Sequence, residues 1–158
     1  MDTTSINVRD ATPADSDALL GLVHELAAHH GDVGELTAEG LRRDAFGDAP
    51  WVQVLVAEAE DGLVGYTALS RIGRLHYAQR GLNMHHLCVS AAHRGQGVGQ
   101  ALVAAARDRA QAEGCIYITV GTDPDNLHAQ GFYLANGFER RPSYPPYFAM
   151  QVQGEDMS

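Results

Sequence analysis

Lysine is absent from this sequence of 158 residues, so all 11 of its basic side chains are arginines. They are outnumbered by 20 acidic residues, and the formal net charge is −9. This balance argues against a nucleic-acid partner, because phosphate backbones bind clusters of lysine and arginine. The acidic residues concentrate between Asp10 and Asp61. We interpret that half as a solvated surface, with attraction of a cationic substrate as the alternative.

Cysteines and long apolar runs are also scarce. The two cysteines, Cys88 and Cys115, lie in apolar, strand-like segments, which predicts buried free thiols in a reducing compartment and hence a cytoplasmic protein. No apolar run approaches the roughly 20 residues that span a membrane, and the polar first residues do not resemble a secretory signal. We therefore expect no membrane partner, and the length predicts one domain over residues 1–158.

Hydrophobic periodicity, caps and turn residues predict how the elements follow one another. Thr12 and Thr37 are expected to cap the first two helices, and Asp61-Gly62 to turn a hairpin. Strands are expected at residues 5–9, 51–60, 63–72, 82–89, 115–120, 138–141 and 147–152, helices at 13–29, 38–47, 98–114 and 126–136, and a loop at 73–81. This order predicts an α/β (α+β) fold with a mixed, mostly antiparallel central sheet of about six or seven strands and helices on both faces.

The segment from Arg94 to Gly99 contains three glycines and lies between an apolar strand and an alanine-rich helix. Glycine lets a ligand approach the backbone closely, and a helix N-terminus offers unpaired N–H groups to an anion. We therefore predict a phosphate-binding loop, with a purely structural turn as the alternative. No Gly-Lys-Ser/Thr follows, so the segment is not a P-loop, and its spacing differs from that of a dinucleotide fingerprint.

Two motifs carry a resemblance to a known family. Arg94-x-x-Gly97-x-Gly99 resembles the Arg/Gln-x-x-Gly-x-Gly/Ala signature of the GNAT superfamily of acyl-CoA-dependent acyltransferases. Downstream, Asn126-x-x-Ala129-x-x-Phe132-Tyr133-x-x-x-Gly137-Phe138 is similar to the second CoA motif of that family. The two motifs occur in the family's order and on the expected elements, so the resemblance covers roughly residues 6 to 152.

The resemblance implies a site for acetyl-CoA as co-substrate, with no metal. The backbones of Leu87, Cys88 and Val89 would bind the pantetheine arm as an added strand. The loop amides would bind the pyrophosphate, and they belong to Arg94, Gly95, Gln96, Gly97, Val98, Gly99 and Gln100. Asn126 would contact the pantetheine, and Tyr133 would lie near the CoA sulfur and protonate the leaving thiolate. The alternative for Tyr133 is packing on the sheet, and the resemblance also implies a homodimer.

A narrower resemblance, to the spermidine/spermine (polyamine) and thialysine acetyltransferase branch, is carried by residues 41–68 and 80–82. Members of that branch commonly carry Glu-Asp where this chain has His85-His86. An unperturbed histidine has a pKa near 6.5 and can take a proton from an ammonium at neutral pH. We expect His85, at the position of the Glu, to be the general base, with His86, an ordered water or a core-packing role as alternatives. Side chains of adjacent strand residues point to opposite faces unless a bulge intervenes.

These patterns together predict an N-acetyltransferase. It would move acetyl from acetyl-CoA to a primary amine of a small, cationic acceptor by direct attack in a ternary complex. The alternatives are an acyl-CoA-binding regulatory module with little turnover, and a protein or peptide N-acetyltransferase. No metal is expected at the histidine pair, because no further residue stands at ligand spacing. The aromatic–proline cluster at residues 144–148 is interpreted as hairpin packing, a wall of the acceptor pocket or a dimer contact.

Overall fold

The computed structural model describes residues 5–29, 35–142 and 148–153. They fall into two compact units, Met1–Asp123 and Pro124–Ser158, whose positions relative to one another are not determined. Each unit is therefore described by itself. The cluster expected at residues 144–148 lies outside the described residues except for Phe148, whose side chain is exposed.

A five-stranded sheet forms the first unit. Its strands follow the order β1-β2-β3-β4-β5, and they span Asn7–Asp10, Gln53–Ala59, Gly62–Arg74, Gln79–Val89 and Tyr117–Val120. The first three pairings are antiparallel, and β4 pairs with β5 in parallel. The expected mixed, mostly antiparallel sheet is thus confirmed, with five strands instead of six or seven.

The two strands expected near the C-terminus do not form. Residues 138–142 and 148–153 belong to no strand, and Tyr147 lies outside the described residues. Glu139 and Arg141 pair with each other at 2.9 Å instead of flanking a ladder. Phe148 and Met150 alternate with smaller or polar residues as in a strand, but their side chains are 89% and 82% exposed. An alternating segment becomes a strand only when a partner covers one face.

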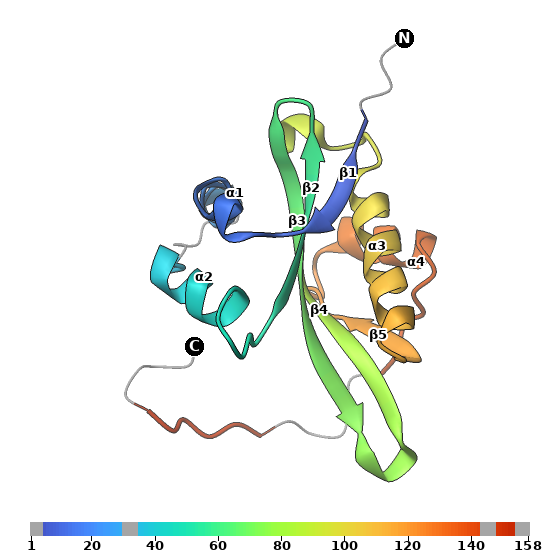
Figure 1. Ribbon diagram of the computed structural model, residues 1–158. Coiled ribbons are helices and arrows are strands. Elements are labelled where there is room, and N and C mark those ends of the chain that lie inside the picture. Colours follow the sequence, from blue (N-terminus) through green and yellow to red (C-terminus); the bar gives the residue numbers. More distant parts are fainter. Residues whose placement is uncertain (1–4, 30–34, 143–147, 154–158) are drawn as a thin grey trace. The chain divides into compact units, whose positions relative to one another are not determined.

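Helices cover both faces of the sheet, as predicted. The short turn η1 (Pro13–Asp15), α1 (Ser16–His29) and α2 (Ala38–Ala45) lie on one side, and α3 (Val98–Ala112) lies on the other (Figure 1). Leu19, Leu22 and Leu26 of α1 pack with Tyr66 on the first side, whereas Val64 packs with Val98 and Leu102 of α3 on the second. A Cβ at Gly65 would lie 2.7 Å from the Cys88 carbonyl oxygen and 3.1 Å from Val98 Cγ1, so only glycine lets α3 approach there.

The hairpin between β3 and β4 is longer than the sequence predicts. The strands continue through most of the loop expected at 73–81 and are joined by the short turn η2 (Leu75–Tyr77). Ala78 closes this turn at a φ of 53°, a left-handed conformation that alanine rarely adopts. The turn lies within the loop predicted at 73–81, but alanine carries no turn signal, so the sequence did not show how short the turn is.

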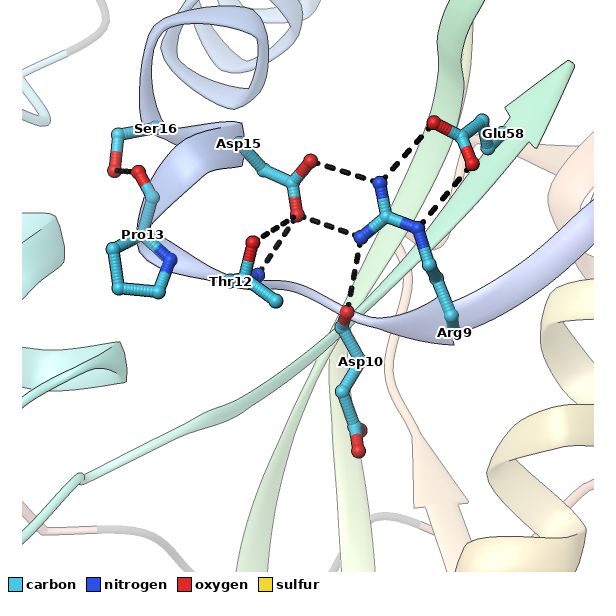
Figure 2. A network of polar contacts seen from close by, with 7 residues as sticks. All are labelled: Arg9, Asp10, Thr12, Pro13, Asp15, Ser16 and Glu58. Atoms are coloured by element: carbon cyan, nitrogen blue, oxygen red, sulfur yellow. Dashed lines mark hydrogen bonds and ion pairs between the residues drawn. The ribbon is translucent and has the colours of Figure 1, made fainter. Parts of the chain in front are cut away.

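An arginine–carboxylate network fixes the start of α1 against the sheet (Figure 2). Arg9 of β1 donates to both carboxylate oxygens of Asp15 at 2.7 and 2.9 Å, and to Glu58 of β2 at 3.3 and 3.2 Å. The backbone N–H of Thr12 donates to Asp15 at 2.8 Å, which confirms the predicted capping box. These bonds, the Arg9 bond foremost, lower the pKa of the nearly buried Asp15 from 3.8 to about 2.

We expect Asp15→Ala to lower the free energy of unfolding by about 2 kcal/mol at neutral pH, because it removes one partner of this network. The folded pKa of Asp15 lies below its unfolded value, so its contribution is present above about pH 4 and fades as the pH falls towards 2. Urea unfolding at pH 7 and near pH 3 should therefore show a smaller difference at the lower pH. Glu25→Ala, an exposed carboxylate of α1, is the control, and equal losses in both variants would contradict the network's role.

Candidate active site

A β-bulge on β4 places the two adjacent histidines. The register of β3 and β4 shifts between Ala68 and Leu69, which pair with His86 and Met84, so His85 is the extra residue. Without a bulge the two side chains would alternate between faces. Here His86 contacts Tyr66 and His85 contacts Ser70. Tyr66 and Ser70 stand four positions apart on β3 and hence share a face, so both histidines lie on the side of α1 and α2. The exception for a bulge therefore applies, and the histidines do not point to opposite faces.

His85 lies over a row of polar side chains that crosses three strands. Ser70 of β3 pairs with Asn83 of β4, and Asn83 pairs with Thr119 of β5. His85 Nε2 is 2.7 Å from Ser70 Oγ, and His85 Nδ1 is 3.4 Å from Asn83 Nδ2. Thr119 Oγ1 donates to Asn83 Oδ1 at 2.7 Å. The imidazole is exposed and hence accessible to a substrate. The contacts at its two ring nitrogens fix its orientation.

His86 is held by a buried tyrosine. The Tyr66 hydroxyl lies 3.3 Å from His86 Nδ1, and the two rings meet edge to face at a centroid distance of 6.4 Å. Tyr66 is only 5% exposed, and burial raises the pKa of its phenol. Thr67 Oγ1 donates to the carbonyl oxygen of His86 at 2.6 Å. Sequence patterns alone assign neither Tyr66 nor Ser70 to the site, because nothing in the sequence reveals which β3 residues face the histidines.

The outer edge of β4 opens beyond the bulge. β5 pairs with β4 only from Gly81 to Met84, and among the described residues those at 86–89 have a strand partner only in β3. Leu87 and Val89 pack on the α3 side, and Cys88 packs on the α1 side. The side chains are thus anchored, while alternate N–H and C=O groups of this segment point away from β3. Such an edge can receive an extended ligand through backbone hydrogen bonds.

The glycine loop follows this edge directly. Gly95 and Gly97 have φ values of 76° and 84°, in the left-handed region that side chains disfavour. Gly97 is the N-cap of α3, and its carbonyl accepts the first helical bond from Ala101 at 3.0 Å. Val98 is 1% exposed and anchors the first turn, which also holds Gly99 and Gln100, whereas Arg94 and Gln96 are exposed. The predicted helix start is confirmed, and the first-turn amides have no partner within the helix.

The second unit contains the residues of the downstream motif. Asn126 caps α4 (Leu127–Ala135), and its Oδ1 accepts from the Ala129 N–H at 3.0 Å. Tyr133 packs edge to face against Phe132 and Phe138, with centroid distances of 5.6 and 5.5 Å. Gly137 follows the helix at a φ of 94°. Asn126 therefore has a local structural role, and the two ring contacts of Tyr133 lie within its own unit.

Two general properties follow from the described residues at 5–29, 35–142 and 148–153. They contain no group of three histidine, cysteine, aspartate or glutamate side chains that could hold a metal ion. None of their helices is long and apolar enough to cross a membrane.

A family model described as the Acetyltransferase (GNAT) family matches residues 22–138. That is most of the chain, and it includes both histidines, the glycine loop and the α4 motif. The chain belongs to the GNAT acetyltransferase family. It is accordingly an acyltransferase that uses acetyl-CoA as its co-substrate.

Individual relatives of this GNAT chain agree with the assignment. It is 26% identical to thialysine N-epsilon-acetyltransferase of Bos taurus, over 96% of this chain and 95% of the relative. It is 28% identical to N-acetyltransferase 8B of Rattus norvegicus, over 79% and 54% of the two chains. An aminoglycoside acetyltransferase from an uncultured soil metagenomic sample has a similar fold, with a TM-score of 0.78 at 17% identity over 92% and 97% of the chains. The aminoglycoside N-acetyltransferase AAC(6')-Iy in complex with CoA superposes with a TM-score of 0.75 at 19% identity over 92% and 95%.

In this GNAT chain the first unit brings together most of the residues that the sequence singled out. His85 and the edge at 87–89 share one strand, and the loop at 94–100 continues from that strand into α3. Asn126 and Tyr133 lie in the second unit, so their distance from β4 is not defined.

Proposed function

We propose that this GNAT chain acetylates a primary amine of a small, cationic acceptor by direct attack on acetyl-CoA in a ternary complex. The bulge on β4 carries the proposal, because it turns two histidines to one face of the strand whose outer edge is open. Similarity over nearly the whole length to an enzyme named thialysine N-epsilon-acetyltransferase supports an amine of this class.

The donor would bind along the open edge and the glycine loop. The backbones of Leu87, Cys88 and Val89 are available to the pantetheine arm, since this edge has no other strand partner among the described residues. The amides from Arg94 to Gln100 would bind the pyrophosphate, which the left-handed glycines and the N-terminus of α3 favour. An N–H near Leu87 or Val89 would stabilise the tetrahedral oxyanion.

Direct attack is favoured over an acetyl-cysteine intermediate. Cys88 lies on the donor edge and is the one cysteine of β4, but burial raises the pKa of its thiol. A protonated thiol is a poor nucleophile. The acceptor nitrogen itself would therefore attack the thioester after losing a proton to His85, and Tyr133 would protonate the departing CoA thiolate.

The charge of the surroundings supports a cationic acceptor. On the face of the two histidines, α1 carries the acidic residues Asp17 and Glu25 and no arginine or lysine, whereas on α2 Glu39 and Asp44 are balanced by Arg42 and Arg43. The negative charge of α1 raises the local concentration of cationic ligands. A single domain over residues 1–158, a cytoplasmic location and a homodimer remain proposals from the sequence, and light scattering on the purified chain would test the dimer.

An amine panel tests the function. Thialysine, lysine, spermidine and spermine would be incubated with acetyl-CoA, and release of the CoA thiol would be followed. We expect turnover of at least one of these small amines, with weaker turnover of a peptide bearing a free N-terminus or a lysine. Acetyl-CoA binding without turnover of any amine would favour the regulatory-module alternative, and preference for the peptide would favour a protein acetyltransferase.

A further inference from the structure

Both ring nitrogens of His85 are already occupied by neighbouring side chains. Nε2 is 2.7 Å from Ser70 Oγ, and Nδ1 is 3.4 Å from Asn83 Nδ2. An ammonium group that approaches this face therefore finds no ring nitrogen without a partner. The shorter and stronger of the two contacts is made by a hydroxyl, which can donate one hydrogen bond while it accepts others.

Ser70 is placed for this contact by the bulge. In a regular ladder the residue next to His86 would point to the α3 side, away from Ser70. Because His85 is the inserted residue, its ring lies instead over the pair formed by Ser70 and Asn83. Ser70 is half-buried and His85 is exposed, so the hydroxyl remains accessible beside the ring.

We propose that Ser70 relays the proton from the acceptor ammonium to His85, an inference that rests on the proposed function. One N–H bond of the ammonium breaks as an O–H bond forms at Ser70 Oγ. The original O–H bond of Ser70 breaks as an N–H bond forms at His85 Nε2. The amine is left neutral with its electron pair free for attack, Ser70 is regenerated, and His85 carries the positive charge.

Asn83 and Thr119 complete the relay as positioning residues. A half turn of the Asn83 amide exchanges its oxygen and nitrogen, and the Thr119 hydroxyl can serve either of them as donor or acceptor. The row can therefore accept a bond from Nδ1–H when the ring is protonated there. In that state Nε2 is the basic nitrogen, and Ser70 donates to it.

The relay is tested with two acceptors that differ in basicity. Lysine is compared with 5,5-difluorolysine, whose fluorines withdraw electron density so that more of its ε-amine is neutral at the assay pH. We expect Ser70→Ala to lower kcat/KM for lysine about 100-fold, with the KM for acetyl-CoA unchanged. For difluorolysine the decrease in kcat/KM should be only about 3-fold or less, because a larger fraction of its amine has already lost the proton. Ser70→Thr, which keeps the hydroxyl, should retain most of the activity.

Two outcomes would overturn the relay. One is a Ser70→Ala enzyme with wild-type kcat/KM for lysine, and the other is an equal loss for both acceptors. His85→Ala and the double variant should resemble Ser70→Ala, because residues that act in series lose their effect together. If the losses of kcat/KM in the two single variants added up in the double variant, Ser70 would not take part in the proton transfer to His85.

Nitrogen NMR separates this proposal from the proposed function. With 15N-histidine labelling and no substrate, the Nε2 resonance of His85 should shift in Ser70→Ala and stay near its wild-type position in Ser70→Thr. If the chemical shift of His85 Nε2 were the same in the wild type and in Ser70→Ala, the contact between Ser70 and His85 would be contradicted, and so would the relay. Wild-type protein that acetylates neither lysine nor difluorolysine would contradict the proposed function, while the NMR result still decides whether Ser70 holds His85.

Discussion

His85→Ala should reduce kcat for amine acetylation about 100-fold or more near neutral pH, with little change in the KM for acetyl-CoA. The imidazole would take the proton that the acceptor must lose, and general-base catalysis typically contributes 10²- to 10⁴-fold. At high pH more of the acceptor amine is already neutral, so the difference in kcat between the wild type and His85→Ala should become smaller. Steady-state rates from about pH 6 to about pH 9 measure both effects.

Two further variants make this result specific. His86→Ala should lower kcat less than about 10-fold, because His86 is bound to the buried Tyr66, whereas His85 contacts the hydroxyl of Ser70. A larger loss there than in His85→Ala would make His86 the base. Tyr133→Phe should lower kcat by slowing protonation of the thiolate. If His85→Ala and Tyr133→Phe both keep the wild-type kcat over the whole range, the two assigned roles are wrong.

Gly97→Val should raise the dissociation constant for acetyl-CoA more than 10-fold. Gly97 has a φ of 84° at the N-cap of α3, and a β-branched residue in that region costs about 1–3 kcal/mol of strain. The loop would relax to a different backbone path and misdirect the amides that we propose to bind the pyrophosphate. Calorimetric titration with acetyl-CoA measures the loss.

The matched control for this variant is Gly21→Ala. Gly21 lies in α1, its φ is not positive, and a Cβ there meets nothing within 4 Å. Its affinity for acetyl-CoA should equal that of the wild type, and its stability should rise by up to about 1 kcal/mol, because alanine favours a helix. Wild-type affinity in Gly97→Val would show that the loop conformation is not needed for the donor.

Helix starts and turns could be predicted because each has a local chemical cause. Thr37 caps α2 through its side chain, and the N–H of Thr12 is bound by Asp15 at the start of η1. Asn126 caps α4. The first hairpin turns at Glu60-Asp61, one residue before the predicted Asp61-Gly62, because Gly62 already pairs with Ala59. The family motif located the glycine loop for a similar reason, since the left-handed angle of its Gly97 favours glycine.

The parts that escaped prediction depend on partners distant in the sequence. The bulge at His85 exists only in the pairing of β3 with β4, and no residue of β4 signals it. The contacts of Ser70 and Tyr66 with the histidines follow from that pairing. The segment at 148–152 has the alternation of a strand, but a strand also needs a neighbour to complete its hydrogen bonds.

Without acetyl-CoA, the open edge of β4 exposes backbone groups that have no strand partner among the residues that the structure describes. Unpaired backbone groups along an edge are a template for any other extended chain, and residues 85–89 present such a row within the described part of the protein. Bound acetyl-CoA would occupy the same groups and block that pairing. The proposed donor site would thus also protect this edge from pairing, and protein stored with acetyl-CoA or CoA should aggregate more slowly than protein stored without it.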